Sequence, residues 1–167
     1  PFLACLEPSS QPGSDMSGLC LSVLGTTVFL PVSVFTLSWQ HSIEKTQWEE
    51  RWRIEEGESS GLVFVEGRIH GSGAGMEPPL QARLDDGVWV YEEPLRLPAL
   101  HLAHSPFALP YRLCPGDEAC HPLDAWLPAL PEIGEVELFP CSPSSPSSPP
   151  SAADSAGSMA RKVSAKR

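Results

Sequence analysis

The sequence predicts a mainly β protein with one small domain, a β-sandwich-like or open-barrel fold, between disordered ends. Stretches of alternating apolar and polar residues, the pattern of a half-buried strand, recur along the chain. The 19 prolines and 13 glycines interrupt almost every stretch that could otherwise extend into a long helix. A chain of 167 residues with 41 % hydrophobic content has room for one packed core. Many short strands between turns, with almost no helix, are typical of a sandwich or barrel.

The composition divides the chain into three parts. Residues 1–15 are rich in Ser and Pro and predict a disordered leader, so that Met16 is a candidate natural start. Residues 16–141 form the predicted β-rich domain. Residues 142–167 are mostly Ser, Pro, Ala and Gly, and such a tail buries too little apolar surface to offset the entropy lost on ordering. We therefore expect the tail to be disordered.

The alternation is clearest in two neighbouring stretches. Phe35, Leu37, Trp39 and His41 share one face of the first, and Trp48, Glu50, Trp52 and Ile54 share one face of the second. A helical turn is expected only at 123–127, behind a proline. We expect strands at 19–24, 28–32, 34–43, 47–55, 62–70, 88–91, 100–103, 111–114 and 136–139, with a turn at 25–27 joining the first two.

Charge and hydropathy exclude two classes of partner. The formal net charge is −10, and residues 16–141 hold 18 acidic and 7 basic side chains. Such a body repels phosphate backbones, which argues against nucleic-acid binding. Residues 19–39 carry no charge and are long enough to span a bilayer, but they are rich in Ser, Thr and β-branched residues and have no basic residue before them. Strands, and no stable membrane span, are the better interpretation; a periplasmic and a cytoplasmic location both stay open for a soluble protein.

Five cysteines occur, none of them in a CxxC pair, so a zinc site has no support. Cys114 and Cys120 flank a turn-forming stretch that could bring their sulfurs together. A disulfide between them in an oxidising compartment and a pair of reduced, partly buried thiols are both compatible with the sequence.

The richest candidate for chemistry is the run 39–50, which packs a histidine, three carboxylates, a lysine and two tryptophans into twelve positions. His41 would lie at the end of an apolar face, either in a site or as a histidine that hydrogen-bonds the backbone. Glu50 would lie between two tryptophans, where a buried carboxylate needs a partner such as Arg68, Lys45 or a ligand cation. If these tryptophans are exposed, Glu50 is merely solvated.

A second candidate is the glycine-rich run 71–75. Its successive N–H groups could form an anion-binding nest, or it could simply bend the chain. We expect both runs to form one shared binding patch. Its candidate residues are His41, Ser42, Glu44, Lys45, Glu50, Gly73, Gly75 and Glu77.

Enzyme templates find little support. The chain has no GxSxG elbow, HExxH motif or P-loop, and no cofactor is implied. Catalysis, as a small hydrolase or metal-dependent enzyme that uses His41 and Glu44, is the alternative to a non-enzymatic module.

Three stretches carry a family resemblance: 35–46 (FTLSWQHSIEKT), 48–53 (WEERWR) and 71–79 (GSGAGMEPP). In these stretches the sequence resembles an uncharacterised bacterial family, domain of unknown function eighteen-fifty, and the likeness covers about residues 18–141. Members of that family are often encoded beside tripartite ATP-independent periplasmic (TRAP) transporters of the TAXI type. The resemblance therefore implies an accessory part in solute uptake, with a transporter component or its small-molecule solute as the partner.

Overall fold

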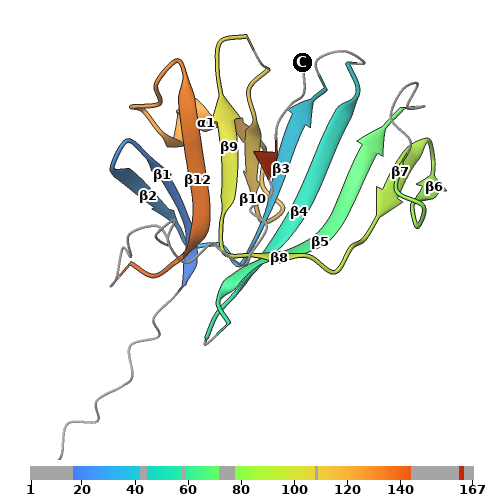
Figure 1. Ribbon diagram of the computed structural model, residues 1–167, viewed down its shortest axis with the longest axis horizontal. Helices are drawn as coiled ribbons and strands as arrows, with labels where there is room; N and C mark the ends of the chain where they lie inside the picture. The colour runs from blue at the N-terminus through green and yellow to red at the C-terminus, as the bar shows by residue number, and fades with distance from the viewer. Residues whose placement is uncertain are drawn as a thin grey trace, which may run out of the picture.

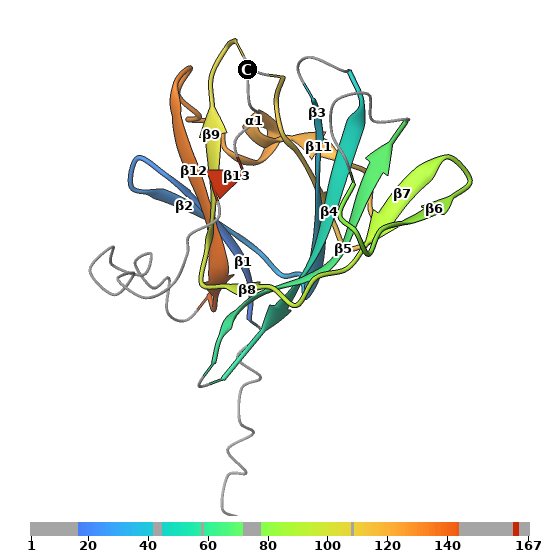
Figure 2. The same cartoon turned by 45° about the vertical axis from the view of Figure 1, so that its right-hand side comes forward.

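The computed structural model describes residues 17–41, 45–57, 59–71, 78–107, 109–143 and 162–163. Two sheets face one another in this part of the chain (Figures 1 and 2). Apart from one two-residue strand, all strand pairs are antiparallel, and the sheets do not close into a barrel. The predicted mainly β, sandwich-like fold is thereby confirmed.

The smaller sheet has the strand order β13-β9-β12-β1-β2. Its first hairpin turns at Leu24 and Gly25, whose φ values of 47° and 80° are those of a two-residue turn that matches strand twist. The turn therefore lies one residue earlier than the expected 25–27. The strands are β1 (Gly18–Val23), β2 (Thr26–Leu30), β9 (Leu100–His104), β12 (Gly134–Cys141) and β13 (Lys162–Val163).

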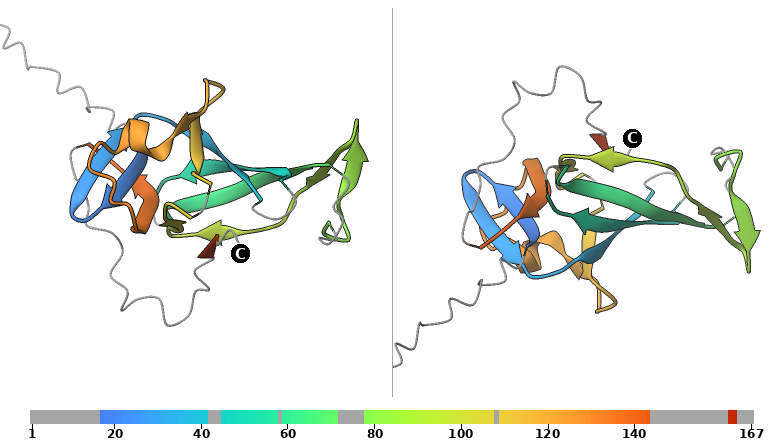
Figure 3. Two further views of the ribbon diagram at one scale, coloured as in Figure 1. Left: turned by 90° about the horizontal axis from the view of Figure 1, so that it is seen from above. Right: turned by 90° about the horizontal axis from the view of Figure 1, so that it is seen from below.

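The larger sheet has the order β11-β10-β3-β4-β5-β7-β6, and β8 also pairs with β5. The β6–β7 hairpin projects well away from the rest of the molecule (Figure 3). Strands β6, β8 and β11, each of only two or three residues, were not predicted from the sequence. The strands are β3 (Val34–Gln40), β4 (Gln47–Glu55), β5 (Gly61–His70), β6 (Arg83–Asp85), β7 (Val88–Tyr91), β8 (Arg96–Leu97), β10 (Arg112–Pro115) and β11 (His121–Pro122).

The main core lies between the two sheets and follows the predicted alternation. From the larger sheet, Phe35, Leu37 and Trp52 are fully buried, and the smaller sheet adds Leu19 and Leu21. The helix α1 (Leu123–Trp126), which the sequence predicted as a helical turn, contributes its first residue to the same core. No helix in the described residues is long and apolar enough to cross a membrane.

A bulge in β5 keeps its inner face continuous. Opposite Arg51 and Trp52 of β4 stand Glu66 and Phe64, so Val65 is the extra residue. The inward parity of β5 therefore changes from Leu62 and Phe64 to Gly67 and Ile69. This shift places Gly67 directly opposite Glu50.

Two disulfides join cysteines of the described chain. Cys114 is bonded to Cys120, which selects the disulfide between the two alternatives that the sequence left open. Cys20 is bonded to Cys141 across β1 and β12, a pairing that the sequence did not suggest because 121 positions separate the two residues. Around this second disulfide Ala99, Phe139 and Phe29 form a small separate apolar cluster.

Beyond residue 143 the structure describes two residues of the tail. Lys162–Val163 pairs in parallel with β9, opposite His101 and Leu102. Residues 1–16, 144–161 and 164–167 lie outside the described part, so for them the predicted leader and tail stay predictions.

Candidate functional site

The larger sheet has a polar face, here called the outer face, formed by the residues that alternate with the core positions. On β3 it carries Thr36 and Ser38, and on β4 it carries Glu49 and Arg51. The two strands are in register there, with Ser38 opposite Glu49 and Thr36 opposite Arg51. Two hollows form over this face.

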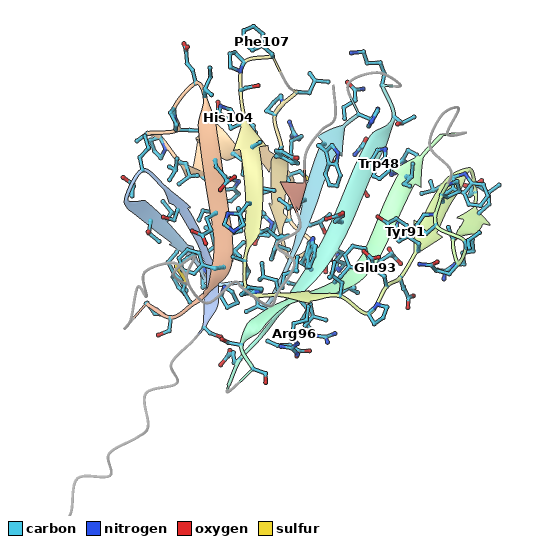
Figure 4. All side chains as sticks on the ribbon, in the orientation of Figure 1. Trp48, Tyr91, Glu93, Arg96, His104 and Phe107 are labelled. Atoms are coloured by element: carbon cyan, nitrogen blue, oxygen red, sulfur yellow. A yellow bond between two sulfur atoms is a disulfide. The ribbon has the colours of Figure 1, made fainter. Side chains whose placement is uncertain are left out.

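The first hollow is a pocket of about 330 Å³ at the end of the sheet where β3 ends and β4 begins. Strands β3 and β4 form its floor, and the connection between β9 and β10 supplies an apolar wall. The tip of that connection carries Phe107, which is exposed at the same end of the molecule (Figure 4). The lining residues are Ser38, Trp39, Gln40, Gln47, Leu109, Pro110, Arg112 and Cys120.

Hydrogen bonds hold the polar groups of this pocket in place. The Nε2 of Gln47 donates to Ser38 Oγ at 3.1 Å and to Glu49 Oε1 at 2.8 Å. The Nε2 of Gln40 donates to the Lys45 carbonyl at 2.9 Å, which ties the pocket to the loop between β3 and β4. Arg112 donates from Nη2 to the Cys120 carbonyl. The pocket is therefore lined by groups of fixed orientation, one of them a cation.

The second hollow, of about 450 Å³, lies over β3, β4 and β5, and both of its arginines already form ion pairs. Arg51 forms an ion pair with Asp117 at 2.9 Å, and Arg68 with Glu66 at 2.5 Å. The hydrogen bond with Glu66 raises the pKa of Arg68, against a smaller opposing effect of burial. Arg68 therefore does not partner Glu50 as the sequence suggested, since it lies on the outer face and binds Glu66.

Glu50 lies on the opposite, inner face of the same sheet. It is 2 % exposed, which confirms its predicted inward parity, and it stands opposite Leu37 and Gly67. The indole Nε1 of Trp52 donates to Glu50 Oε2 at 3.3 Å. The ring of Tyr91 lies over Gly67, where an added Cβ would come within 2.2 Å of it. Glu50 is thus enclosed by aromatic groups and does not line the pocket on the outer face.

His41 lies just beyond β3, beside a row of aromatic rings. Its ring centroid is 6.2 Å from that of Trp48, which is 6.1 Å from Trp39, which in turn is 5.6 Å from Tyr111. The backbone N–H of His41 donates to the Thr46 carbonyl at 2.8 Å. His41 Nδ1 and Trp48 Nε1 are buried and have no hydrogen-bond partner among the described residues. The row of aromatic rings therefore also carries two buried polar nitrogen atoms, one on His41 and one on Trp48.

The structure separates two residues that the sequence placed in one patch. Glu50 pairs with Leu37, whereas His41 follows four positions later, so about 13 Å of strand lies between them at the usual rise per residue. The Trp39–Trp48 pair fills that interval. Glu50 and His41 are therefore not in contact.

The other patch residues are only partly described. Lys45 lies in the loop after β3 with φ of 58°, and Thr46 packs beside Gly71, so the loop and the start of the glycine run are neighbours. Ser42, Glu44, Gly73, Gly75 and Glu77 lie outside the described residues, and their part in a site stays a prediction. Within the described ranges no group of three His, Cys, Asp or Glu residues could hold a metal ion.

Several of the pocket residues were not predicted from the sequence. Gln40 and Gln47 belong to the run 39–50 and Ser38 directly precedes it, but all three lie on the face opposite to the one predicted to form the site. Arg112 lies 72 positions after Gln40 in the chain and reaches the pocket only because β10 pairs with β3. The sequence signal that could have identified Ser38 and Gln40 is the polar half of the alternating pattern at residues 36–40.

Fold and site together define a small antiparallel two-sheet domain with a polar pocket on the outer face of its larger sheet. The chain belongs to the family described as "Domain of unknown function (DUF1850)", whose profile matches residues 35–123. Every residue that lines the 330 Å³ pocket falls within that match. No curated protein and no solved structure matches the chain.

Proposed function

We propose that the chain is a non-enzymatic accessory module that binds a small solute in the 330 Å³ pocket and acts beside a TRAP-type uptake system. The pocket itself carries the proposal. Its volume lies within the range of small-molecule sites, about 300–1,000 Å³. It also combines an apolar wall at Leu109 and Pro110 with a few oriented polar groups, which is the usual make-up of such sites.

The hydrogen bonds of the pocket favour binding over catalysis. A serine nucleophile needs a neighbouring base that takes its proton. Ser38 Oγ instead accepts a hydrogen bond from the Gln47 amide, and an amide does not titrate. The histidine of the alternative enzyme hypothesis, His41, lies by the aromatic row and does not line this pocket.

Two further observations support a place in solute uptake. Disulfides persist in oxidising compartments such as the periplasm, and the described chain holds two of them. The family resemblance points to genes of TRAP transporters, whose binding components are periplasmic. A transporter component or its solute is accordingly the proposed partner.

A thermal-shift screen of the full chain against small solutes tests the binding function. Solutes that raise the melting temperature of the parent should lose that effect in Leu109→Trp, because the larger ring fills the pocket. Leu84→Trp is the matched control, since Leu84 is likewise exposed but lies on the projecting hairpin. Shifts that persist in Leu109→Trp, or no shift with any solute, would contradict the proposal.

A further inference from the structure

Arg112 differs from the neighbouring arginines of the larger sheet in what it binds. Arg51, Arg53 and Arg68 each form an ion pair with a carboxylate at 2.9 Å or less. The chain is acidic, with 21 acidic and 11 basic residues. Arg112 nevertheless has no carboxylate within 4.0 Å in the described part of the chain. The Arg112 cation therefore faces a pocket without a counter-charge from the described residues.

The position of Arg112 is set by its strand and by a disulfide loop. On β10 it stands opposite Ser38 of β3 and Pro122 of β11. One N–H of its guanidinium is occupied by the Cys120 carbonyl, and Cys120 is tied back to the same strand through Cys114. A guanidinium has five N–H donors, so this single bond orients the group and leaves others for a ligand.

We propose that the pocket selects a small carboxylate with an apolar body, and that Arg112 is the group that binds the carboxylate. This rests on the proposed solute-binding function and adds the class of solute. The planar guanidinium matches the two oxygens of a carboxylate in a bidentate pair. Leu109 and Pro110 supply an apolar wall for the remainder of the ligand.

The acidic character of the protein does not oppose this assignment. Charges more than about 8 Å from the ligand are largely screened at physiological ionic strength. The electrostatic contribution to ligand binding therefore comes mainly from the charged groups close to the ligand. The nearest carboxylate on β4, Glu49, accepts a hydrogen bond from Gln47 at 2.8 Å and also lies 3.7 Å from His70 Nε2. Glu49 is thus held by Gln47, and no ion pair joins it to Arg112 in the described part of the chain.

Isothermal titration calorimetry with two probes of equal shape tests the proposal. The probes are 4-methylpentanoate and 4-methylpentanamide, which differ in the charge of the head group. We expect the carboxylate to bind the full chain at least about tenfold more tightly than the amide. Arg112→Gln should weaken carboxylate binding about 10- to 100-fold and leave amide binding unchanged, with Arg112→Lys in between.

The control is Arg83→Gln, which removes an exposed arginine from β6, outside the pocket, and should leave both affinities as in the parent. Circular dichroism establishes that each variant is folded, and the comparison of the two probes on the parent needs no variant. Equal affinity for carboxylate and amide, or carboxylate binding that survives Arg112→Gln, overturns the anion assignment. If neither probe binds while neutral solutes still shift the melting temperature of the parent, the solute class is wrong and the binding function stands.

Discussion

At the scale of single residues, the inner face of the larger sheet depends on one glycine. Gly67 stands between Glu50 of β4 and Tyr91 of β7, and the tyrosine ring occupies the space that a side chain would need. The same ring stacks on Phe64 with centroids 5.6 Å apart. An aromatic ring that covers a strand glycine restores the packing which the missing side chain would have provided.

We predict that Gly67→Ala destabilises the protein by about 1–3 kcal/mol, as overpacking of a well-packed core does. The added Cβ would lie 2.2 Å from the Tyr91 ring, so that ring must move. Chemical denaturation of the parent and the variant measures the cost. The control is the same change in a Tyr91→Ala background, where the cost should be much smaller; an equal cost in both backgrounds would show that the ring is not the cause.

At the scale of elements, β12 carries a carboxylate that burial affects. Burial raises the pKa of Glu137, while His101 on β9 acts in the opposite direction and Glu135 adds a small further rise. Val136 and Leu138 on either side of Glu137 are fully buried, so the strand cannot turn this side chain further toward solvent without losing core contacts. The charged form of Glu137 is therefore less favourable in the folded than in the unfolded chain.

Because the pKa of Glu137 is raised in the folded protein, we predict that Glu137→Gln stabilises the protein at neutral pH. With the folded pKa above the ordinary value of 4.5, the native state binds more protons than the unfolded state in the window just above that value. Stability of the parent should fall as pH rises through this window, and the variant should lack this component. Denaturation midpoints between acid and neutral pH measure it, with the exposed Glu132→Gln as control; a gain that persists unchanged in acid would contradict the assignment.

At the scale of the whole molecule, two long-range links join distant parts of the described chain in the smaller sheet. The Cys20–Cys141 disulfide closes nearly the entire described domain, and β13 adds to β9 at the edge of the same sheet. The two links differ greatly in strength. A two-residue strand contributes little, whereas removing a native disulfide costs about 2–5 kcal/mol in small domains.

We predict that deletion of residues 143–167 leaves the thermal melt essentially unchanged, because a tail composed mostly of Ser, Pro, Ala and Gly offers little apolar surface to a core. Amide exchange in Leu100–His104 should nevertheless become faster, since β9 loses its outer neighbour. Mass spectrometry with hydrogen exchange separates these effects, and the amides of β4 serve as an internal control. A drop of several degrees in the melting temperature would show that the tail docks more extensively.

The sequence by itself determined what depends on neighbours along the chain. A strand alternates with a period of two, so the inward parity of Leu37, Trp39 and Glu50 could be predicted from local pattern alone. The turns and the helical turn at α1 were local as well. The short strands β6, β8 and β11 were not predictable, because two or three residues carry no measurable period.

Only the tertiary structure decided the order of the strands, the bulge at Val65, the Cys20–Cys141 bond and the pocket. Each of these depends on which distant strands pair and in what register, and one chain carries no local signal for that choice. The pocket is the clearest case. Arg112 reaches Ser38 only through the pairing of β10 with β3, and that pairing forms within a sheet whose apolar face packs against the core shared with the smaller sheet.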